Sequence, residues 1–245
     1  MSVPMVVAHR GANVDLPEQG LAAYVRAIEV GADAIECDVR LTKDGHLVCH
    51  HDRTVNRTSN GSGAISDLTL AELEKLDFAA GKPGAADGER HQIMTFANLL
   101  RLVSEAPRPV RMLVETKHPT RFGPQVETAL HRALADHPDL DVTVMSFARA
   151  AVTRYRAMDD RTPLVWLFEY PLGSAPAAAT VIGPRLELLR SRPHLVADAH
   201  TAGRRVFVWT VNTPDDVRFV RDIGADAIIT DDPHMALRTL GRTPA

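Results

Sequence analysis

Short runs rich in Val and Ile alternate along the chain with segments whose apolar residues recur at helical spacing, and this alternation constrains the fold most strongly. The expected strands are residues 5–8, 34–39, 110–115, 142–146, 164–167, part of 180–188, 206–210 and 227–230. The expected helices are residues 20–30, 96–104, 124–136, 148–158, 193–202, 214–222 and 233–240. Eight such units predict an α/β fold of the TIM (β/α)8 barrel type, because right-handed crossovers can all lie on one side of a parallel sheet only if it closes.

An open, doubly wound sheet of the Rossmann type is the alternative arrangement of the same units. Its dinucleotide-binding form carries a glycine-rich turn after the first strand. The corresponding turn here, His9–Asn13, has no such fingerprint. The closed barrel is therefore favoured.

Residues 53–94 interrupt the alternation after the second strand and an Asp-Gly hairpin turn at residues 44–45. This stretch contains a short helix with Thr69 as its N-cap, and a loop rich in Gly, Pro, Ala and Asp at residues 81–88. We interpret it as a short insertion, so residues 1–245 are expected to form a single barrel domain.

The composition is that of an ordinary globular protein, 45% hydrophobic and 24% charged, with a formal net charge of -3. This charge gives no electrostatic reason to expect nucleic acid or an anionic membrane surface as a partner. The N-terminus lacks the features of a signal peptide, and no segment is long and apolar enough for stable membrane insertion. Cys37 and Cys49 lie in expected strands and are interpreted as reduced core residues. A cytoplasmic location is therefore expected.

Two pairs of charged residues have the spacing that places side chains on one face of a strand. Glu36 and Asp38 lie in the second expected strand, and Glu115 and Lys117 lie at the end of the third. The active site of a TIM barrel lies at the C-terminal ends of its strands, so these side chains are expected to meet. Three convergent carboxylates offer the oxygen ligands that Mg²⁺ and Ca²⁺ prefer. They could instead be ion-pair partners of Arg10 and Lys117.

Two histidines are expected at the same end of the barrel. The first strand ends in His9-Arg10, and His51-Asp52 follows the hairpin beside the second strand. A divalent ion with Arg10 and Lys117 can stabilise the negative charge that develops when a phosphodiester is hydrolysed, while one histidine removes a proton and the other supplies one.

Seven motifs follow one another along nearly the whole chain. They are Val7-Ala8-His9-Arg10-Gly11, Pro17-Glu18, Glu36-x-Asp38-Val39-x-Leu41-Thr42-Lys43-Asp44-Gly45, His51-Asp52-x-Thr54-Val55-x-Arg57-Thr58, Glu115-x-Lys117, Ser146-Phe147 and Trp209-Thr210-Val211-Asn212. Together they resemble the glycerophosphodiester phosphodiesterase family. The resemblance implies a TIM barrel with a short insertion after the second strand. It also implies hydrolysis of glycerophosphodiesters to glycerol 3-phosphate and an alcohol.

The resemblance also implies a role for each site residue. Glu36, Asp38 and Glu115 would be the metal ligands, and His9 and His51 would be the acid/base pair. Arg10 and Lys117 would bind the phosphate, and Trp209 would line the substrate pocket. The cofactor would be Mg²⁺ or Ca²⁺ and the partner a small-molecule glycerophosphodiester. Asp52 is expected to raise the basicity of His51, which would then be the general acid. The preferred alcohol and the oligomeric state are left open.

Some positions depart from the family pattern or have a simpler interpretation. Gln19-Gly20 replaces the usual Asn-Thr, which is expected to affect the capping of the first helix more than the chemistry. Asp231 and Asp232 are interpreted as caps of the last helix, and Asn212 as the cap of the helix entered at Pro214. Trp209 could equally be barrel packing.

Three other functions remain open. A barrel lyase or isomerase could use Lys117 or His51 as a base beside a metal-bound enolate, although it would need fewer cations and histidines than this chain has. A phosphate-binding protein without catalysis would not need both histidines. A lysophospholipase D-type enzyme would hydrolyse a lysolipid headgroup by the same chemistry.

Overall fold

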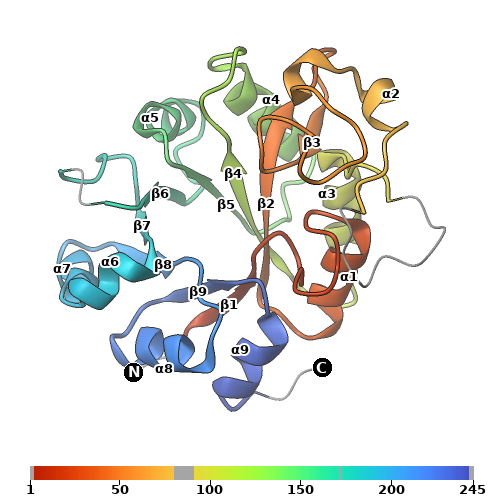
Figure 1. Ribbon diagram of the computed structural model, residues 1–245. Helices are drawn as coiled ribbons and strands as arrows, with labels where there is room; N and C mark the ends of the chain where they lie inside the picture. The colour runs from red at the N-terminus through yellow and green to blue at the C-terminus, as the bar shows by residue number, and fades with distance from the viewer. Residues whose placement is uncertain (1–2, 80–90, 171–172, 243–245) are drawn as a thin grey trace.

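The computed structural model describes residues 3–79, 91–170 and 173–242, and its strands close into a barrel surrounded by helices (Figure 1). The strands are β1 (Met5–Ala8), β2 (Ala34–Leu41), β3 (Leu47–Cys49), β4 (Arg111–Thr116), β5 (Val142–Ser146), β6 (Leu164–Phe168), β7 (Val181–Pro184), β8 (Arg205–Val208) and β9 (Ala227–Thr230). They form one sheet in the order β1-β9-β8-β7-β6-β5-β4-β2-β3, and an additional pairing of β1 with β2 closes it. These pairings are parallel except for that of β2 with β3. The predicted TIM barrel is therefore confirmed.

The helices follow the strands as expected, with one addition. They are α1 (Leu21–Glu29), α2 (Leu70–Leu73), α3 (Phe96–Ser104), α4 (Gln125–Ala135), α5 (Arg149–Met158), α6 (Leu186–Ser191), α7 (Leu195–Thr201), α8 (Pro214–Asp222) and α9 (Pro233–Thr239), with a 3-10 turn at Ile65–Asp67. The predicted cap of α2 is confirmed, because Thr69 and Glu72 form a reciprocal capping box. The short helix α6 lies where the sequence pattern is unclear, since 6 residues are too few to show a helical period.

Side chains that point toward the barrel axis form an apolar core of their own. Its buried members are Val7, Ala34, Leu113, Met145, Val165, Leu167, Val181, Phe207, Ala227 and Ile229. The alternate residues of each strand, such as Ile35 and Cys37 of β2, belong to a second core shared with the helices. Residue 183 of β7 has to be glycine, because a Cβ at this position would lie 2.5 Å from the side chain of Leu167.

The predicted hairpin is present between β2 and the insertion. β3 pairs with the C-terminal half of β2, and Gly45 in the turn has a φ of 86°, which favours glycine. The insertion has its own small apolar core, formed by Val48, Val55, Ile65, Leu73, Phe78 and Ile93. The predicted loop at residues 81–88 lies outside the described residues. Because β3 joins the C-terminal half of β2, the insertion lies beside the end of the barrel where the site is expected.

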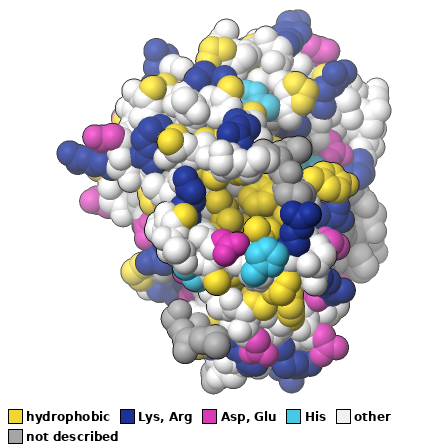
Figure 2. Space-filling view, turned by 90° about the vertical axis from the view of Figure 1, so that its left-hand side faces the viewer, with side chains coloured by type: hydrophobic (Ala, Val, Ile, Leu, Met, Phe, Trp, Pro, Cys, Tyr) yellow, Lys and Arg dark blue, Asp and Glu magenta, His cyan; other side chains and the backbone are white. Residues whose placement is uncertain are grey.

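Figure 2 shows the side where α5, α6 and α7 lie, and charged side chains of both signs there surround a recessed apolar area. Among the helices of the described residues, none has the length and apolar character needed to cross a membrane.

Candidate active site

A pocket of about 290 Å³ opens at the C-terminal ends of the barrel strands. It is lined by His9, Arg10, Glu36, His51, Glu115, Lys117, Met145, Phe147, Leu167, Glu169, Trp209 and Ile229. Strand alternation explains much of this set, because His9, Glu36 and Glu115 each lie two positions beyond an inward-facing apolar residue of the same strand. The pocket thus brings together seven of the eight predicted site residues, and the eighth, Asp38, contacts two of them.

Glu36, Asp38 and Glu115 form a buried carboxylate cluster. One ligand oxygen from each lies within 4.8 Å of the others. Burial, followed by the charge of Asp38, raises the pKa of Glu36 well above its ordinary value. Burial likewise raises the pKa of Glu115 to about 7. Burial opposes ionisation of Asp38 too, yet Lys117 and Arg10 hold the pKa of Asp38 well below its usual range.

Two cations neutralise part of this negative charge. Nζ of Lys117 lies 3.1 Å from Oδ1 of Asp38 and 2.9 Å from Oε1 of Glu115. Nε of Arg10 lies 3.1 Å from Oδ2 of Asp38, and the backbone N–H of Arg10 donates to Oε2 of Glu36 at 3.0 Å. Arg10 has a φ of 56°, a left-handed conformation that is uncommon for residues other than glycine and tends to occur at functional sites.

The carboxylate cluster fits a hard divalent cation. Three carboxylates face two cations, so a buried negative charge is left over when all five groups are ionised. A divalent ion would supply the missing positive charge, and carboxylate oxygens are the ligands that such ions prefer. The cluster could therefore hold a metal ion. The ion pairs with Arg10 and Lys117 are also present, so the two sequence interpretations do not exclude each other.

His51 is held by a chain of charged groups. Its Nδ1 lies 2.7 Å from Oδ1 of Asp52. Arg57 of the insertion donates to Oδ2 of Asp52 and to Oε2 of Glu18, each at 2.7 Å, and Glu18 also accepts from Arg10 at 3.0 Å. The predicted contact of Asp52 with His51 is present. Burial lowers the pKa of His51 below its ordinary value and outweighs the hydrogen bond to Asp52, which raises this pKa as predicted.

His9 has a carboxylate partner that the sequence interpretation missed. Its Nδ1 lies 2.7 Å from Oδ1 of Asp231. The side-chain amide of Asn13 donates to the same oxygen at 2.9 Å, and that of Asn212 donates to Oδ2 at 2.6 Å. Burial opposes ionisation of Asp231, but the hydrogen bond with His9 and these amides hold its pKa far below the usual range. His9 is therefore held against an ionised carboxylate.

Two capping assignments are consequently wrong. Asp232 caps α9 as predicted, but Asp231 does not, and Thr213 rather than Asn212 caps α8. Asp231 lies two positions beyond the inward-facing Ile229. The strand alternation that identified Glu36 and Asp38 was therefore the signal that could have identified Asp231 as well.

Gln19 connects the first helix to the carboxylate cluster. The buried amide donates from Nε2 to Oδ2 of Asp38 at 2.6 Å, and its Oε1 accepts from the hydroxyl of Tyr24 at 2.6 Å. Gly20 is the N-cap of α1 and makes no side-chain hydrogen bond, as the departure from the family pattern predicted. Gln19, which replaces the usual Asn, thus also contacts the carboxylate cluster, which was not expected from the sequence.

An aromatic wall closes the other side of the pocket. The rings of Phe147 and Trp209 pack edge to face with centroids 5.3 Å apart. Trp209 follows β8, donates from Nε1 to the backbone carbonyl of Gly183 at 2.7 Å and packs against the inner core. Trp209 thus both lines the pocket and packs the barrel. Glu169, two positions beyond Leu167, also lines the pocket.

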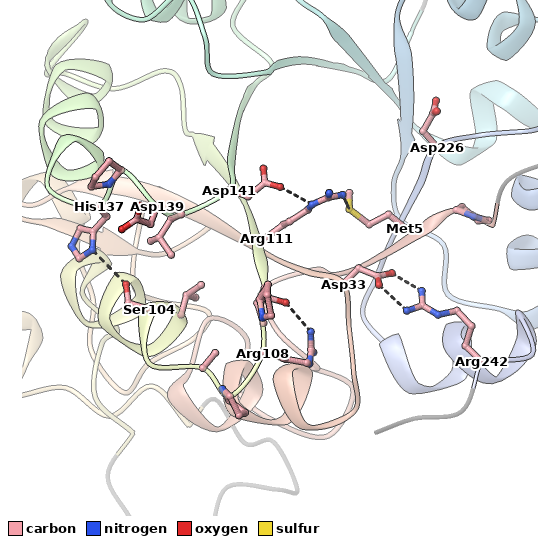
Figure 3. A pocket seen from close by; sticks show the side chains of 18 of the residues that line it. Met5, Asp33, Ser104, Arg108, Arg111, His137, Asp139, Asp141, Asp226 and Arg242 are labelled. Carbon is pink, nitrogen blue, oxygen red and sulfur yellow. Dashed lines mark hydrogen bonds and ion pairs between the residues drawn. The ribbon is translucent and has the colours of Figure 1, made fainter.

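A larger cavity, of about 1380 Å³, lies at the opposite end of the barrel, where the strands begin (Figure 3). Asp33 there pairs with Arg242, and Arg111 pairs with Asp141 (Figure 3). None of the predicted site residues lines this cavity. Its larger size does not make it the better candidate, because these charges neutralise one another.

Comparison with known proteins agrees with the motifs. The model of the Glycerophosphoryl diester phosphodiesterase family matches residues 9–235. The chain belongs to this family. The family predicted from the motifs is thereby confirmed.

Relatives match this phosphodiesterase family member over most of their length. A Mycobacterium tuberculosis protein named Probable glycerophosphodiester phosphodiesterase 1 is 43% identical, with 99% of this chain and 92% of the relative covered. The Glycerophosphodiester phosphodiesterase of Caldanaerobacter subterraneus is 35% identical, with 94% of each chain covered. An Oleispira antarctica phosphodiesterase, solved in complex with the product sn-glycerol-3-phosphate, shares the fold with a TM-score of 0.90 at 24% identity, covering 98% of this chain and 97% of that chain.

Proposed function

We propose that the protein hydrolyses glycerophosphodiesters to glycerol 3-phosphate and an alcohol, with a divalent ion, Mg²⁺ or Ca²⁺, held by Glu36, Asp38 and Glu115. The observation that carries the proposal is the meeting of this carboxylate cluster with two cations and two histidines in one pocket. Membership of the family supports the same reaction. The cytoplasmic location and the single-domain organisation stay predictions.

The two cations, Arg10 and Lys117, are assigned to binding of the phosphodiester. Arg10 and Lys117 line the pocket next to the carboxylate cluster, where their donors can bind phosphoryl oxygens. A Mg²⁺ or Ca²⁺ ion held by Glu36, Asp38 and Glu115 would supply Lewis-acid stabilisation of the negative charge that develops on those oxygens. Phe147 and Trp209 exclude water from the opposite wall.

Proton transfer is assigned to the two histidines. Burial lowers the pKa of His51 and so favours its neutral form, which accepts a proton from the attacking nucleophile. His9, held against the ionised Asp231, donates a proton to the leaving alkoxide as the P–O bond breaks. This assignment reverses the expectation from sequence that His51 is the acid.

A product assay tests the proposal. The purified protein is stripped of metal and incubated with a panel of glycerophosphodiesters, with EDTA or with added Mg²⁺ or Ca²⁺, and glycerol 3-phosphate is measured. Product is expected only when a divalent ion is present. Turnover in EDTA at the rate of the metal-supplemented protein would contradict the metal requirement, and absence of glycerol 3-phosphate under every condition would contradict the reaction.

A further inference from the structure

The side-chain amide of Gln19 holds Asp38 at two points. Nε2 of Gln19 donates to Oδ2 of Asp38 at 2.6 Å, and Oε1 of Gln19 accepts a longer hydrogen bond from the backbone N–H of Asp38 at 3.4 Å. Both residues are buried, with 4% of Gln19 and 1% of Asp38 exposed, so water competes little for these bonds. The amide therefore fixes the carboxylate of Asp38 relative to the backbone of β2.

Tyr24 completes this arrangement from the side of α1. Its hydroxyl donates to Oε1 of Gln19 at 2.6 Å. Reversal of the amide would place its oxygen against the carboxylate of Asp38, where two acceptors would face each other. Burial raises the pKa of the Tyr24 hydroxyl well above its ordinary value, so the hydroxyl remains a donor at neutral pH. The amide is thus held in one orientation.

The backbone of Gln19 is also constrained. Gln19 has a φ of 61°, a left-handed conformation that persists in residues other than glycine only where the surrounding contacts hold it. Its N–H donates to the carbonyl oxygen of Arg10 at 2.9 Å, which ties it to the turn after β1. Gly20 and not Gln19 is the N-cap of α1, so capping of the helix does not explain the position of the amide.

We propose that Gln19, supported by Tyr24, is a positioning residue that holds Asp38 in the orientation a metal ligand requires. Loss of a side chain that hydrogen-bonds a ligating group typically lowers metal affinity about 10–100-fold. Unlike Arg10 and Lys117, the amide carries no charge, so it orients Asp38 without offsetting the negative charge that attracts a cation. This inference rests on the proposed function and adds a residue at which the chain departs from the usual Asn of the family.

The alternative is that Gln19 only fills space beside α1. Gln19→Met separates the two roles, because methionine keeps an unbranched side chain of similar length but donates no hydrogen bond. Tyr24→Phe is milder, since it keeps the buried ring and removes only the hydroxyl that donates to Gln19. Gln125→Met is the matched control, because Gln125 is an exposed residue at the start of α4.

The measurement is the Kd of Mg²⁺ and of Ca²⁺ for the metal-stripped protein by isothermal titration calorimetry. The Tm of the metal-stripped protein is measured in parallel, because it reports packing without metal binding. Gln19→Met is expected to raise the Kd about tenfold or more, and Tyr24→Phe to raise it by a smaller factor. Gln125→Met should stay within about twofold of the wild type.

The outcomes separate the inference from the proposed function. An unchanged Kd in either folded variant, even with a lower Tm, would assign Gln19 to packing and overturn the inference, and so would an equal rise for Gln125→Met. If Gln19→Met does not fold, the Kd of Tyr24→Phe decides by the same criterion. A wild type that binds neither ion would contradict the metal site of the proposed function itself. A raised Kd in the two variants with tight binding by the wild type and the control would support the inference.

Discussion

Replacement of Asp231 by asparagine should disable His9 without unfolding the protein. Oδ1 of Asp231 lies 2.7 Å from Nδ1 of His9 and accepts from Asn13, while Oδ2 accepts from Asn212. Both oxygens therefore face donors. An asparagine side chain replaces one of these oxygens with an NH₂ group, so at least one donor faces another donor whichever way the amide turns.

Rotation of the Asn212 side-chain amide cannot relieve this conflict without breaking other hydrogen bonds. Oδ1 of Asn212 already accepts from the backbone N–H of residue 231 at 3.0 Å and from the hydroxyl of Thr230 at 3.2 Å. His9 would lose its preferred tautomer or the hydrogen bond that orients its ring. Losing the orienting carboxylate of a catalytic histidine costs about a hundredfold or more in rate, equivalent to about 3 kcal/mol in the activation free energy.

The assay is steady-state hydrolysis of glycerophosphocholine at saturating divalent ion, with circular dichroism to verify folding. Asp231→Asn is expected to lower kcat about a hundredfold or more, with a small change in KM. Asp232→Asn is the matched control, because it removes the same charge one position later while asparagine still caps α9. A folded Asp231→Asn variant with wild-type kcat would refute the reasoning, and so would an equal loss for both variants.

Three further predictions follow from the contacts. Added Mg²⁺ or Ca²⁺ should raise the Tm of the wild type more than that of Glu36→Gln in scanning calorimetry, and equal rises would argue against binding at the carboxylate cluster. His9→Ala should lose about a hundredfold in kcat/KM on glycerophosphocholine but recover much of this loss on a nitrophenyl diester, because a good leaving group needs no general acid. His51→Ala should lose activity on both substrates, because the general base is needed for both. The reverse pattern would exchange the roles of the two histidines. Burial opposes ionisation of Asp33, yet the ion pair with Arg242 lowers the pKa of Asp33 in the folded protein. The ionised carboxylate therefore stabilises the fold above pH 3.8, the ordinary pKa of aspartate. This stabilisation is lost as the pH falls through the lower pKa of the folded state. Because the ion pair is partly exposed, its contribution is small, and Asp33→Asn should lower the free energy of unfolding by about 0.5–1 kcal/mol at neutral pH and by less in acid. Urea titrations measure this free energy, and an equal loss at both pH values would contradict the linkage.

The fold and much of the site could be predicted from the sequence because they depend on short-range periodicity. The repeated change between apolar runs and helical spacing identifies the barrel units, and only closure satisfies their handedness. Spacing of two within a strand was enough to place Glu36 with Asp38, and Glu115 with Lys117, on the inner face. These inferences need no knowledge of which strands are neighbours.

The partners of the histidines could not be predicted, because they depend on contacts between distant parts of the chain. Asp231 meets His9 across 222 residues, only because the last strand closes the barrel beside the first. The pKa of His51 depends on how deeply the folded chain buries it, which no local pattern records, and so the direction of its shift could not be predicted. The sequence by itself therefore determined the barrel and the groups at its strand ends. The tertiary structure decided which of those groups touch and which protonation states they favour, because contact and burial exist only after the barrel has closed.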